Sequence, residues 1–516
     1  MLPLVQLVSV RCSKPSLQDN TGDIDRLKKN VAACSGPAPV VPYGAMATLA
    51  TAFRQSGFAG HAVLNDCGSH CQLVDFLAEK PEIMPAVALD LGTTHLEASL
   101  LDLLTGEVLA QATIANGQID YGTDILTRIH FAATPGGLAT LQEAVIASIN
   151  TLCAELCDKA RVESGDIRAL AVSGNTTMVH LLLQIEPRYL RRDPYIPTVS
   201  DFPILKAGEI GLKANPMAAV FVMPGPASYV GGDIVSGVLY TGFHREEPTT
   251  LFIDVGTNGE IVLGNKDWLM TAACSAGPAF EGGGIRWGMR AEDGAIEKVT
   301  IDPQTLAPDL STVGDAPARG ICGSGMIDLI AELLKTGIVD RSGQFSRELS
   351  NERVRKQGDE WAYVLTFADE TPMEEDIVFT ASDLKNLVYS KGAVYAGFTT
   401  LLGEAGMDFS MVDRMIITGG FGQYLNIEKA VTIGLLPDID RSKFAYMGNS
   451  SIVGATMALL STRYRQEARD ICNNMTYVDF SSNPRYMDEF TSALFLPHTD
   501  LNAFPNVDTA AYSPIR

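Results

Sequence analysis

The 516-residue sequence has no apolar run of about 18 residues, the length that a membrane-spanning helix requires. Basic residues are scarce beside acidic ones: 39 Lys and Arg stand against 61 Asp and Glu, a formal net charge of −22. Nucleic acids and anionic membranes bind basic patches, so this charge argues against both as partners. The N-terminus also lacks the basic leader and small-residue cleavage site of a signal peptide. We therefore expect a cytoplasmic protein that binds neither nucleic acid nor membrane.

Cysteine occurs nine times, but never as a tight Cys-x-x-Cys pair. An odd number of scattered thiols in a long chain is typical of reduced cysteines. Metal and iron–sulfur sites usually need four ligands at closer spacing than Cys67 and Cys71 offer. These two could bind a metal together with His70, and Cys12 and Cys34 could complete the set only if the fold brings them in, so this alternative remains open. The two commonest nucleotide motifs, Gly-x-x-x-x-Gly-Lys-Ser/Thr and a Gly-x-Gly-x-x-Gly after a first strand, are absent as well.

Strand and helix patterns alternate along the whole chain, which indicates an α/β protein. Residues 1–85 carry two strand patterns and two helix patterns and end between two prolines. From residue 86 three alternating runs follow one another closely, as in a meander of strands. A long helical pattern then extends from about residue 122 to 156.

Two hairpins of the same chemistry dominate the rest of the sequence. "AVALDLGTTHLEASLL" (86–101) and "TTLFIDVGTNGEIVLG" (249–264) each end a buried strand in an aspartate, Asp90 or Asp254, before a polar turn. The two aspartates lie 254 − 90 = 164 residues apart, which suggests two related halves. Glycine lets the backbone approach a ligand, and N–H and hydroxyl groups in such a turn can wrap phosphate oxygens. An aspartate beside them can hold Mg²⁺ or its waters.

A third element fits the same ligand. "MIITGGFGQYLN" (415–426) is an apolar strand that ends in three closely spaced glycines, which would let a base and ribose lie against the backbone. A simple turn between strand and helix is the alternative for this segment taken alone.

The two aspartate hairpins and the late Gly-Gly-x-Gly resemble the ATPase superfamily of acetate and sugar kinases, heat-shock cognate proteins and actin. Within it, "VSGNTTMVHLLL", "CSAGPAFEGGGIRWGM", "GICGSGMIDLIAELL" and "MDEFTSALFLPHTDLNAFPNV" resemble the reductive activators of corrinoid proteins. Those proteins couple ATP to the return of cobalamin from its inactive cob(II) state to cob(I) in methyl-transfer systems. The resemblance covers nearly the whole chain.

The resemblance implies an α/β, duplicated ribonuclease-H-like, two-lobed actin/sugar-kinase-like ATPase fold with a small α/β N-terminal domain. We expect that domain over residues 1–85, the first ATPase lobe over 86–240 and the second over 241–516. We expect the last helices to return to the first lobe. ATP and Mg²⁺ would bind in a cleft between the lobes.

The resemblance also implies roles for individual residues. Asp90 and Asp254 would position Mg²⁺, and Asp233 would orient the attacking water, with a helix start as the alternative for Asp233. Lys391 would approach the base or ribose, with a solvated surface lysine as the alternative. The remaining nucleotide contacts are expected from phosphate-cradling turns, a helix start and the adenosine-facing glycines: Gly92, Thr93, Thr94, Gly256, Thr257, Asn258, Gly323, Ser324, Gly419, Gly420 and Gly422. His180, on an apolar helix, is expected to be a core histidine.

One departure from the family pattern concerns the electrons. Many such activators carry a ferredoxin module with a Cys-x₄-Cys-x₂-Cys run, and no such run occurs here. We therefore expect no iron–sulfur cluster in this chain and a separate ferredoxin-type donor. The predicted function is an ATPase that assists reduction of cob(II)alamin in a corrinoid protein partner. A small-molecule kinase of the same superfamily and a non-hydrolysing nucleotide-binding scaffold remain alternatives.

Overall fold

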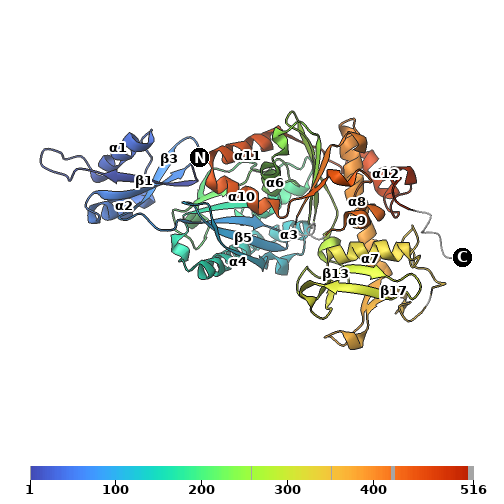
Figure 1. Ribbon diagram of the computed structural model, residues 1–516. Coiled ribbons are helices and arrows are strands. Elements are labelled where there is room, and N and C mark those ends of the chain that lie inside the picture. The colour runs from blue at the N-terminus through green and yellow to red at the C-terminus, as the bar shows by residue number, and fades with distance from the viewer. Residues whose placement is uncertain (1, 257, 350, 420–424, 509–516) are drawn as a thin grey trace. The chain divides into compact units, whose positions relative to one another are not determined.

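The computed structural model describes residues 2–256, 258–349, 351–419 and 425–508. The chain folds as two compact units (Figure 1). Unit 1 contains Met1–Gly242 and Ser450–Asn474, and unit 2 contains Phe243–Asn449 and Met475–Arg516. Among the residues described, no helix combines the length and the apolar character needed to cross a bilayer.

Unit 1 begins with a small α/β domain. Its antiparallel sheet has the order β1-β2-β3, formed by Val5–Arg11, Ala59–Asp66 and Cys71–Leu77. Two helices, α1 (Asp23–Ser35) and α2 (Tyr43–Gln55), cover one face and close a core that includes Leu27, Leu49 and Phe53. The helices and strands expected in residues 1–85 are thus confirmed, with ends shifted by a few residues.

The main sheet of unit 1 has six strands in the order β6-β5-β4-β7-β9-β8. The first three form an antiparallel meander, and β7 and β9 are parallel to β4. The strands are β4 (Pro85–Leu91), β5 (His95–Asp102), β6 (Val108–Ala115), β7 (Ala169–Gly174), β8 (Leu205–Lys206) and β9 (Ala219–Val222). The helices are α3 (Ile125–Ala132), α4 (Gly137–Ala160), α5 (Thr176–Leu182), α6 (Gly232–Thr241), α10 (Ser450–Leu460) and α11 (Thr462–Asn474). Figure 1 shows α10 and α11, in orange and red, beside elements from the first half of the chain, and α10 packs on α6, β4 and β7.

Unit 2 contains a sheet built in the same way. Its order is β20-β19-β10-β11-β12-β21, with β10, β11 and β12 antiparallel and β19 and β20 parallel to β10. The strands are β10 (Thr250–Val255), β11 (Gly259–Gly264), β12 (Leu269–Cys274), β19 (Arg414–Thr418), β20 (Phe444–Tyr446) and β21 (Met475–Tyr477). Both sheets therefore place a meander beside two parallel strands, and the predicted duplication of an α/β fold is confirmed.

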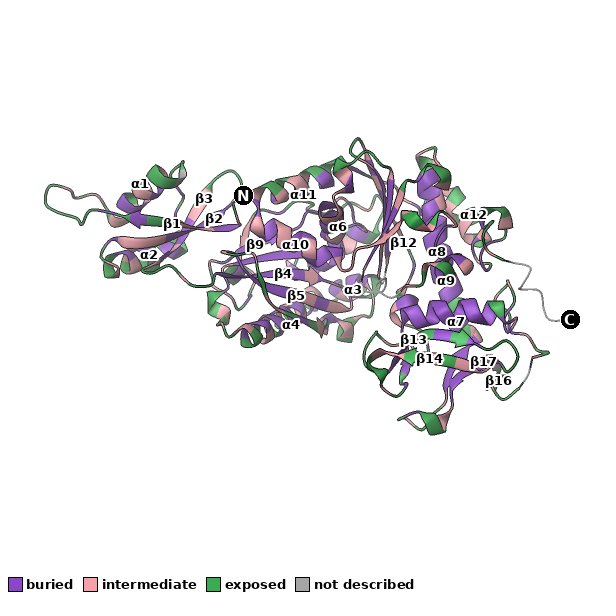
Figure 2. Cartoon of the chain, in the orientation of Figure 1, coloured by how far each residue is buried: buried purple, intermediate pink, exposed green. Residues whose placement is uncertain are grey.

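Two further three-stranded sheets and helix α7 lie between β12 and β19 in the sequence. The sheets contain β13 (Ala295–Ile301), β14 (Pro308–Thr312) and β15 (Gly320–Ile321), and β16 (Val354–Gln357), β17 (Glu360–Thr366) and β18 (Ile377–Thr380). The helices of unit 2 are α7 (Gly323–Lys335), α8 (Ala381–Glu404), α9 (Ile427–Thr432) and α12 (Pro484–Ser492). Figure 2 shows α7 buried along almost its full length.

The single helix expected over residues 122–156 is wrong: the structure has two helices, α3 and α4. Pro135 and Gly136 separate them, and Gly136 has a φ of 79°, a left-handed conformation that favours glycine. Proline disfavours a helical conformation in the residue before it, so the helical pattern is interrupted here.

The small N-terminal domain is tied to the junction of α10 and α11. The backbone N–H of Leu4 donates to the carbonyl of Leu459 at 2.8 Å. The Asp66 carboxylate accepts hydrogen bonds from Arg465 at 2.6 Å and Thr462 at 2.7 Å. Burial would raise the pKa of Asp66, but the bonds from Thr462 and the backbone and the charge of Arg465 hold it below its ordinary value. Both members of this ion pair are buried, with Asp66 7% and Arg465 3% exposed.

We expect Asp66→Ala to lower the free energy of unfolding by about 3 kcal/mol, because it leaves the Arg465 guanidinium buried without its carboxylate. Urea unfolding followed by circular dichroism measures this loss. Glu155→Ala removes an exposed ion pair with Lys159 and is the matched control, with an expected change of at most about 0.5 kcal/mol. Equal effects of the two variants would contradict a stabilising role for the buried pair.

Candidate functional site

The carboxylate of Asp90 stands at the end of the central strand of unit 1. Its direct neighbour on the antiparallel strand β5 is Glu97, and its neighbour on the parallel strand β7 is Ser173. Directly opposed residues in a sheet have their side chains on the same face. Two carboxylates and one hydroxyl therefore share one face at this edge of the sheet.

A chain of serine hydroxyls joins Asp90 to two helices. Ser451 of α10 donates to Asp90 Oδ1 at 2.8 Å, and its hydroxyl oxygen lies 2.9 Å from that of Ser173. The Ser173 hydroxyl lies 2.8 Å from that of Ser236 and donates to the carbonyl of Gly232 at 3.2 Å, both in α6. The three serines are at most 3% exposed. The end of β4 and the first turn of α6 thus belong to one buried hydrogen-bond network.

Asp233 lies in that first turn of α6. The close approach of α6 to the β7–α5 turn requires glycine, because a Cβ on Gly231 would lie 2.5 Å from the carbonyl oxygen of Gly174. The Asp233 Oδ1 accepts the N–H of Ile234 at 2.9 Å. The helix that carries Asp233 thus shares the network of Asp90 through Gly232 and Ser236, and the acidic charge of Asp233 also suits the start of a helix.

The turn after Asp90, residues 92–94, is braced by Asn116. The Asn116 side chain donates to the Gly92 carbonyl and its backbone N–H donates to the Thr94 carbonyl, each at 2.9 Å. A Cβ on Gly92 would lie 2.4 Å from the carbonyl oxygen of His95, so only glycine fits. The polar turn with its two threonines is therefore held in one conformation. Asn116, 1% exposed, was not among the residues expected from the sequence.

The second hairpin repeats the arrangement in unit 2. Asp254 ends β10, with Glu260 opposite on β11 and Thr418 opposite on the parallel strand β19. The Thr418 hydroxyl donates to Asp254 Oδ2 at 3.1 Å. Thr418 thus occupies in this sheet the place that Ser173 occupies in the first. Neither residue was expected from the sequence.

Glycines allow the backbone to pack closely around Asp254. Gly419 has a φ of 97°, and a Cβ there would lie 2.5 Å from the Val255 carbonyl oxygen and 2.9 Å from Asp254 Oδ1. A Cβ on Gly256 would lie 3.5 Å from Oε1 of Glu281, which adds another carboxylate beside the hairpin. Gly256 donates its N–H to the Asn258 carbonyl at 3.0 Å and closes the turn. The expected residues Thr257, Gly420 and Gly422 lie outside the described residues.

Gly323 and Ser324 open helix α7, as expected, and both are buried. A Cβ on the next glycine, Gly325, would lie 2.2 Å from the Ile296 carbonyl oxygen, so α7 packs closely on β13. The Ser324 hydroxyl lies 3.4 Å from the sulfur of Cys322. This close packing is enough to explain the Gly-Ser-Gly sequence.

Lys391 lies on α8, but it is only 1% exposed and sits within unit 2. Its ammonium nitrogen donates to the carbonyls of Phe495 and, at 2.6 Å, of Pro497. Burial lowers the pKa of Lys391 well below its ordinary value. Both sequence-based interpretations, a nucleotide contact and a solvated surface lysine, fail to fit this position.

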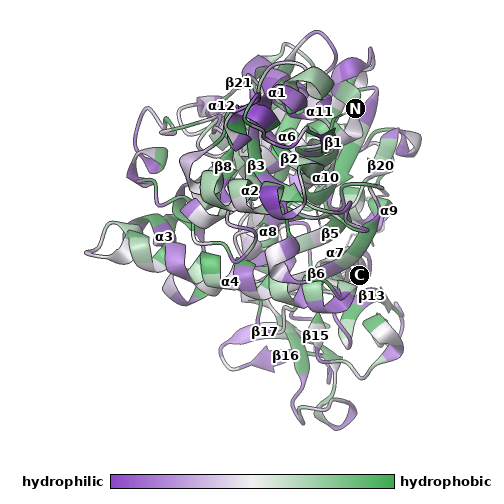
Figure 3. Cartoon of the chain, turned by 90° about the vertical axis from the view of Figure 1, so that its left-hand side faces the viewer, coloured by the Kyte–Doolittle hydropathy of each residue, from purple (hydrophilic) through white to green (hydrophobic). Residues whose placement is uncertain are grey.

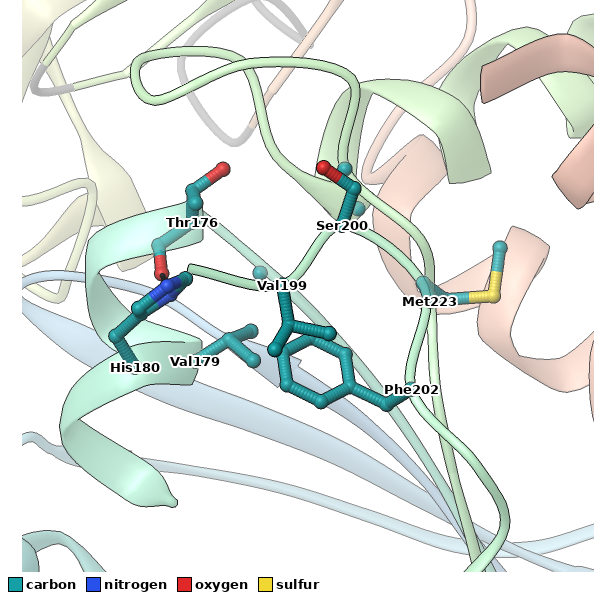
Figure 4. A pocket seen from close by; sticks show the side chains of 10 residues that line it. Thr176, Val179, His180, Val199, Ser200, Phe202 and Met223 are labelled. Atoms are coloured by element: carbon teal, nitrogen blue, oxygen red, sulfur yellow. Dashed lines mark hydrogen bonds between the residues drawn. The ribbon is translucent and has the colours of Figure 1, made fainter. Parts of the chain in front are cut away.

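His180 is a core residue, as expected. It is fully buried, its Nδ1 lies 2.8 Å from the Thr176 carbonyl oxygen, and its Nε2 accepts the N–H of Thr198. Burial lowers its pKa, which favours the neutral ring. Figure 4 shows His180 beside Val179, Val199 and Phe202 around a cavity of about 10 Å³, room for one water at most.

The nine cysteines are all unpaired thiols. Burial raises the pKa of the Cys67 thiol to about 11, so this thiol is protonated at neutral pH. In the part of the chain that the structure describes, no group of three or more His, Cys, Asp or Glu side chains is arranged to hold a metal.

Family models match the chain over most of its length. The RACo linker region matches residues 1–81, the RACo middle region residues 85–246, and the C-terminal domain of RACo, the ASKHA domain, residues 248–508. ASKHA denotes the acetate and sugar kinase, heat-shock cognate and actin superfamily, so the fold implied by the two hairpins is confirmed.

Individual related proteins support the same family as the family models. A solved structure described as a reductive activator for a corrinoid, iron–sulfur protein is 45% identical with a TM-score of 0.91, over 98% of this chain and 81% of that chain. The corrinoid activation enzyme RamQ of Eubacterium limosum is 32% identical over 445 residues, 84% of this chain and 74% of the relative. A reductase of the Co(II) methylated amine-specific corrinoid protein of Methanosarcina barkeri is 27% identical over 423 residues, 76% of this chain and 73% of the relative. The chain therefore belongs to the RACo family.

Proposed function

We propose that this chain activates a corrinoid protein by using ATP to assist the one-electron reduction of cob(II)alamin to cob(I)alamin. Both named relatives and the similar solved structure are described by their action on corrinoid proteins, which supports the substrate. The ATPase activity in this proposal is supported by one arrangement that occurs in both sheets. In each, an aspartate near the end of a central strand lies between a glutamate on one neighbouring strand and a hydroxyl residue on the other.

The donor set at these strand ends fits a magnesium-bound nucleotide. Two carboxylates directly opposite each other in a sheet destabilise it unless a cation offsets their repulsion. Mg²⁺ prefers carboxylate oxygens and its own waters as ligands, and it bridges to phosphates. In this proposal Asp90 and Asp254 hold Mg²⁺ or its waters. Bound ATP supplies the free energy of its hydrolysis.

The glycine-lined turns supply the remaining contacts in this proposal. The rigid turn after Asp90 and its counterpart after Asp254 present N–H and hydroxyl donors to phosphate oxygens. The strand end at Gly419 faces the adenosine in this proposal. Asp233 orients the attacking water, because its helix shares the buried network of Asp90. Lys391 has no part in binding, since both of its acceptors are backbone carbonyls of its own unit.

ATP binding and hydrolysis would act by shifting the population of states that hold the corrinoid protein differently. Moving such an equilibrium from 1:99 to 99:1 takes about 5.5 kcal/mol of differential binding, which nucleotide turnover can supply. The reduction itself consumes one electron per cobalt. The sequence contains no run of four ferredoxin-type cysteines, which supports a donor outside these 516 residues.

Anaerobic assays with ATP, a corrinoid protein and a low-potential reductant test the proposal. We expect ATP hydrolysis that the corrinoid protein stimulates, together with the absorption spectrum of cob(I)alamin. Phosphate transfer to a metabolite would support a kinase of the same superfamily instead. Nucleotide binding without turnover would support a scaffold.

We expect Asp254→Asn to lower ATP turnover about 100-fold, because the amide keeps the shape and an acceptor for Thr418 but removes the charge that holds the metal. Steady-state phosphate release at varied Mg²⁺ measures the effect. Asp267→Asn, in an exposed loop of the same unit, is the control and leaves turnover unchanged.

The double variant tests whether Asp90 and Asp254 act on one nucleotide. If they do, the fold-loss of ATP turnover in Asp90→Asn/Asp254→Asn is smaller than the product of the two single fold-losses. Independent, multiplicative losses would argue against a shared ligand.

Asp233→Asn should separate catalysis from binding. Orienting a water affects the transition state more than the ground state, so we expect turnover to fall at least about 30-fold while the ATP dissociation constant changes less than about threefold. Phosphate release and isothermal titration measure the two quantities. A purely structural role at the helix start would instead lower the melting temperature and leave turnover per folded molecule intact.

A further inference from the structure

Unit 2 contains a second cavity, of about 530 Å³, that none of the candidate nucleotide residues lines. Its walls come from the loop 342–347, the start of β17, one face of the first turns of α8, and Leu494 and Phe495. The volume lies in the range of small-molecule sites in proteins, about 300–1,000 Å³. The cavity is therefore large enough for a ligand of several fused or linked rings.

The cavity lies beyond the far end of α7 from the helix start that the sequence led us to expect at the nucleotide. Gly323 and Ser324 open α7, whereas the loop that lines the cavity follows the C-terminal end of α7. A helix of 13 residues is about 20 Å long. None of the residues proposed to hold the nucleotide lines the cavity, so we treat its occupant as a different molecule.

The wall formed by Leu494 and Phe495 is fixed by backbone hydrogen bonds. Lys391 donates to the Phe495 carbonyl, and Arg341 donates to the carbonyls of Leu496 at 3.3 Å and His498 at 2.7 Å. The Leu496 N–H in turn donates to the Arg341 carbonyl at 2.9 Å. These bonds hold the segment in place without a ligand, so the cavity is preformed, which lowers the entropic cost of binding.

Aromatic rings form much of the apolar lining, beside the aliphatic side chains of Leu384, Val388 and Leu494. Trp361, Tyr389 and Phe495 reach the cavity, and Tyr389 and Phe495 keep 46% and 37% of their surface exposed. Such rings present flat faces against which another planar ring can stack. Exposed aromatic side chains gathered around one cavity favour a planar, apolar occupant.

Two cations give the lining its charge. Arg347 and Lys385 both line the cavity and are exposed, and the Lys385 ammonium lies 5.5 Å from the centre of the Tyr389 ring. Within the described ranges neither cation is paired with a carboxylate. Glu360, the one acidic residue of the lining, already accepts the N–H and hydroxyl of Ser382 at 3.0 and 2.7 Å. With two cations and one carboxylate, the lining carries a net positive charge that a ligand would meet.

We propose that this cavity is a binding site for a small planar aromatic anion, with its rings against Trp361, Tyr389 and Phe495 and its acidic group facing Lys385 and Arg347. The site is independent of the proposed ATPase activity. Its occupant is recognised by ring stacking and by one or two cation contacts.

A fluorescence titration of the folded full-length protein tests the proposal, with 8-anilinonaphthalene-1-sulfonate as the probe. We expect saturable binding of one probe per chain in the absence of nucleotide. Tyr389→Ala should weaken binding about threefold to tenfold, the worth of one aromatic contact. Lys385→Ala combined with Arg347→Ala should weaken it by a similar factor. N-phenyl-1-naphthylamine, which has the same rings and no charge, should bind more weakly to the unaltered protein.

Lys298→Ala removes an exposed cation of β13 in the same unit and serves as the control, with unchanged affinity. Circular dichroism and melting temperature must match between variants, because partly unfolded protein also binds this probe. Probe binding that is absent, or that is unaffected by the Tyr389 and Lys385/Arg347 variants, would overturn the site. Equal affinity for the uncharged probe would overturn its preference for anions. Loss of ATPase activity elsewhere in the protein would leave each of these results unchanged.

Discussion

One arrangement recurs in both units and underlies the proposed function: a carboxylate at the end of a central strand, with a second carboxylate beside it on the antiparallel neighbour and a hydroxyl on the parallel neighbour. Asp90 with Glu97 and Ser173 form one such set, and Asp254 with Glu260 and Thr418 form the other. Each set needs a meander and a parallel strand in the same sheet, which is the strand order that both units share. The shared strand order thus gathers these three groups on one face in each sheet.

Helix α10 links this constraint to the small N-terminal domain. Its first turn carries Ser451, which is bonded to Asp90, and the carbonyl of Leu459 near its other end accepts the N–H of Leu4. An 11-residue helix spans about 16 Å. A Cβ on Gly454 would lie 2.4 Å from the Ser236 carbonyl oxygen, so α10 also packs tightly on α6. The helix is largely apolar (Figure 3), and close packing over its length leaves little freedom for its ends to move independently.

Much of this architecture could be predicted because short periodic patterns determine local structure. The hairpins around Asp90 and Asp254 follow from alternating apolar residues and from the turns between them. The partners of the two aspartates could not be predicted in the same way. Ser451 lies 361 residues from Asp90 in the sequence, and only the packing of α10 on the sheet brings the two side chains together. The break between α3 and α4 was visible in the sequence as Pro-Gly. The helical pattern on either side nevertheless favours a single helix, and that prediction is wrong because proline is the stronger local signal.

Lys391 shows why a motif-like setting does not establish a role. Its neighbours in the sequence suggest an exposed helix, yet its two acceptors, Phe495 and Pro497, lie 104 and 106 residues away. Burial lowers the pKa of Lys391 well below its ordinary value. Its two hydrogen bonds hold the segment 494–498 in the interior of unit 2. Lys391 is thereby engaged within its own unit, so the exposed cations that line the cavity, Lys385 and Arg347, are the ones left to meet an anion.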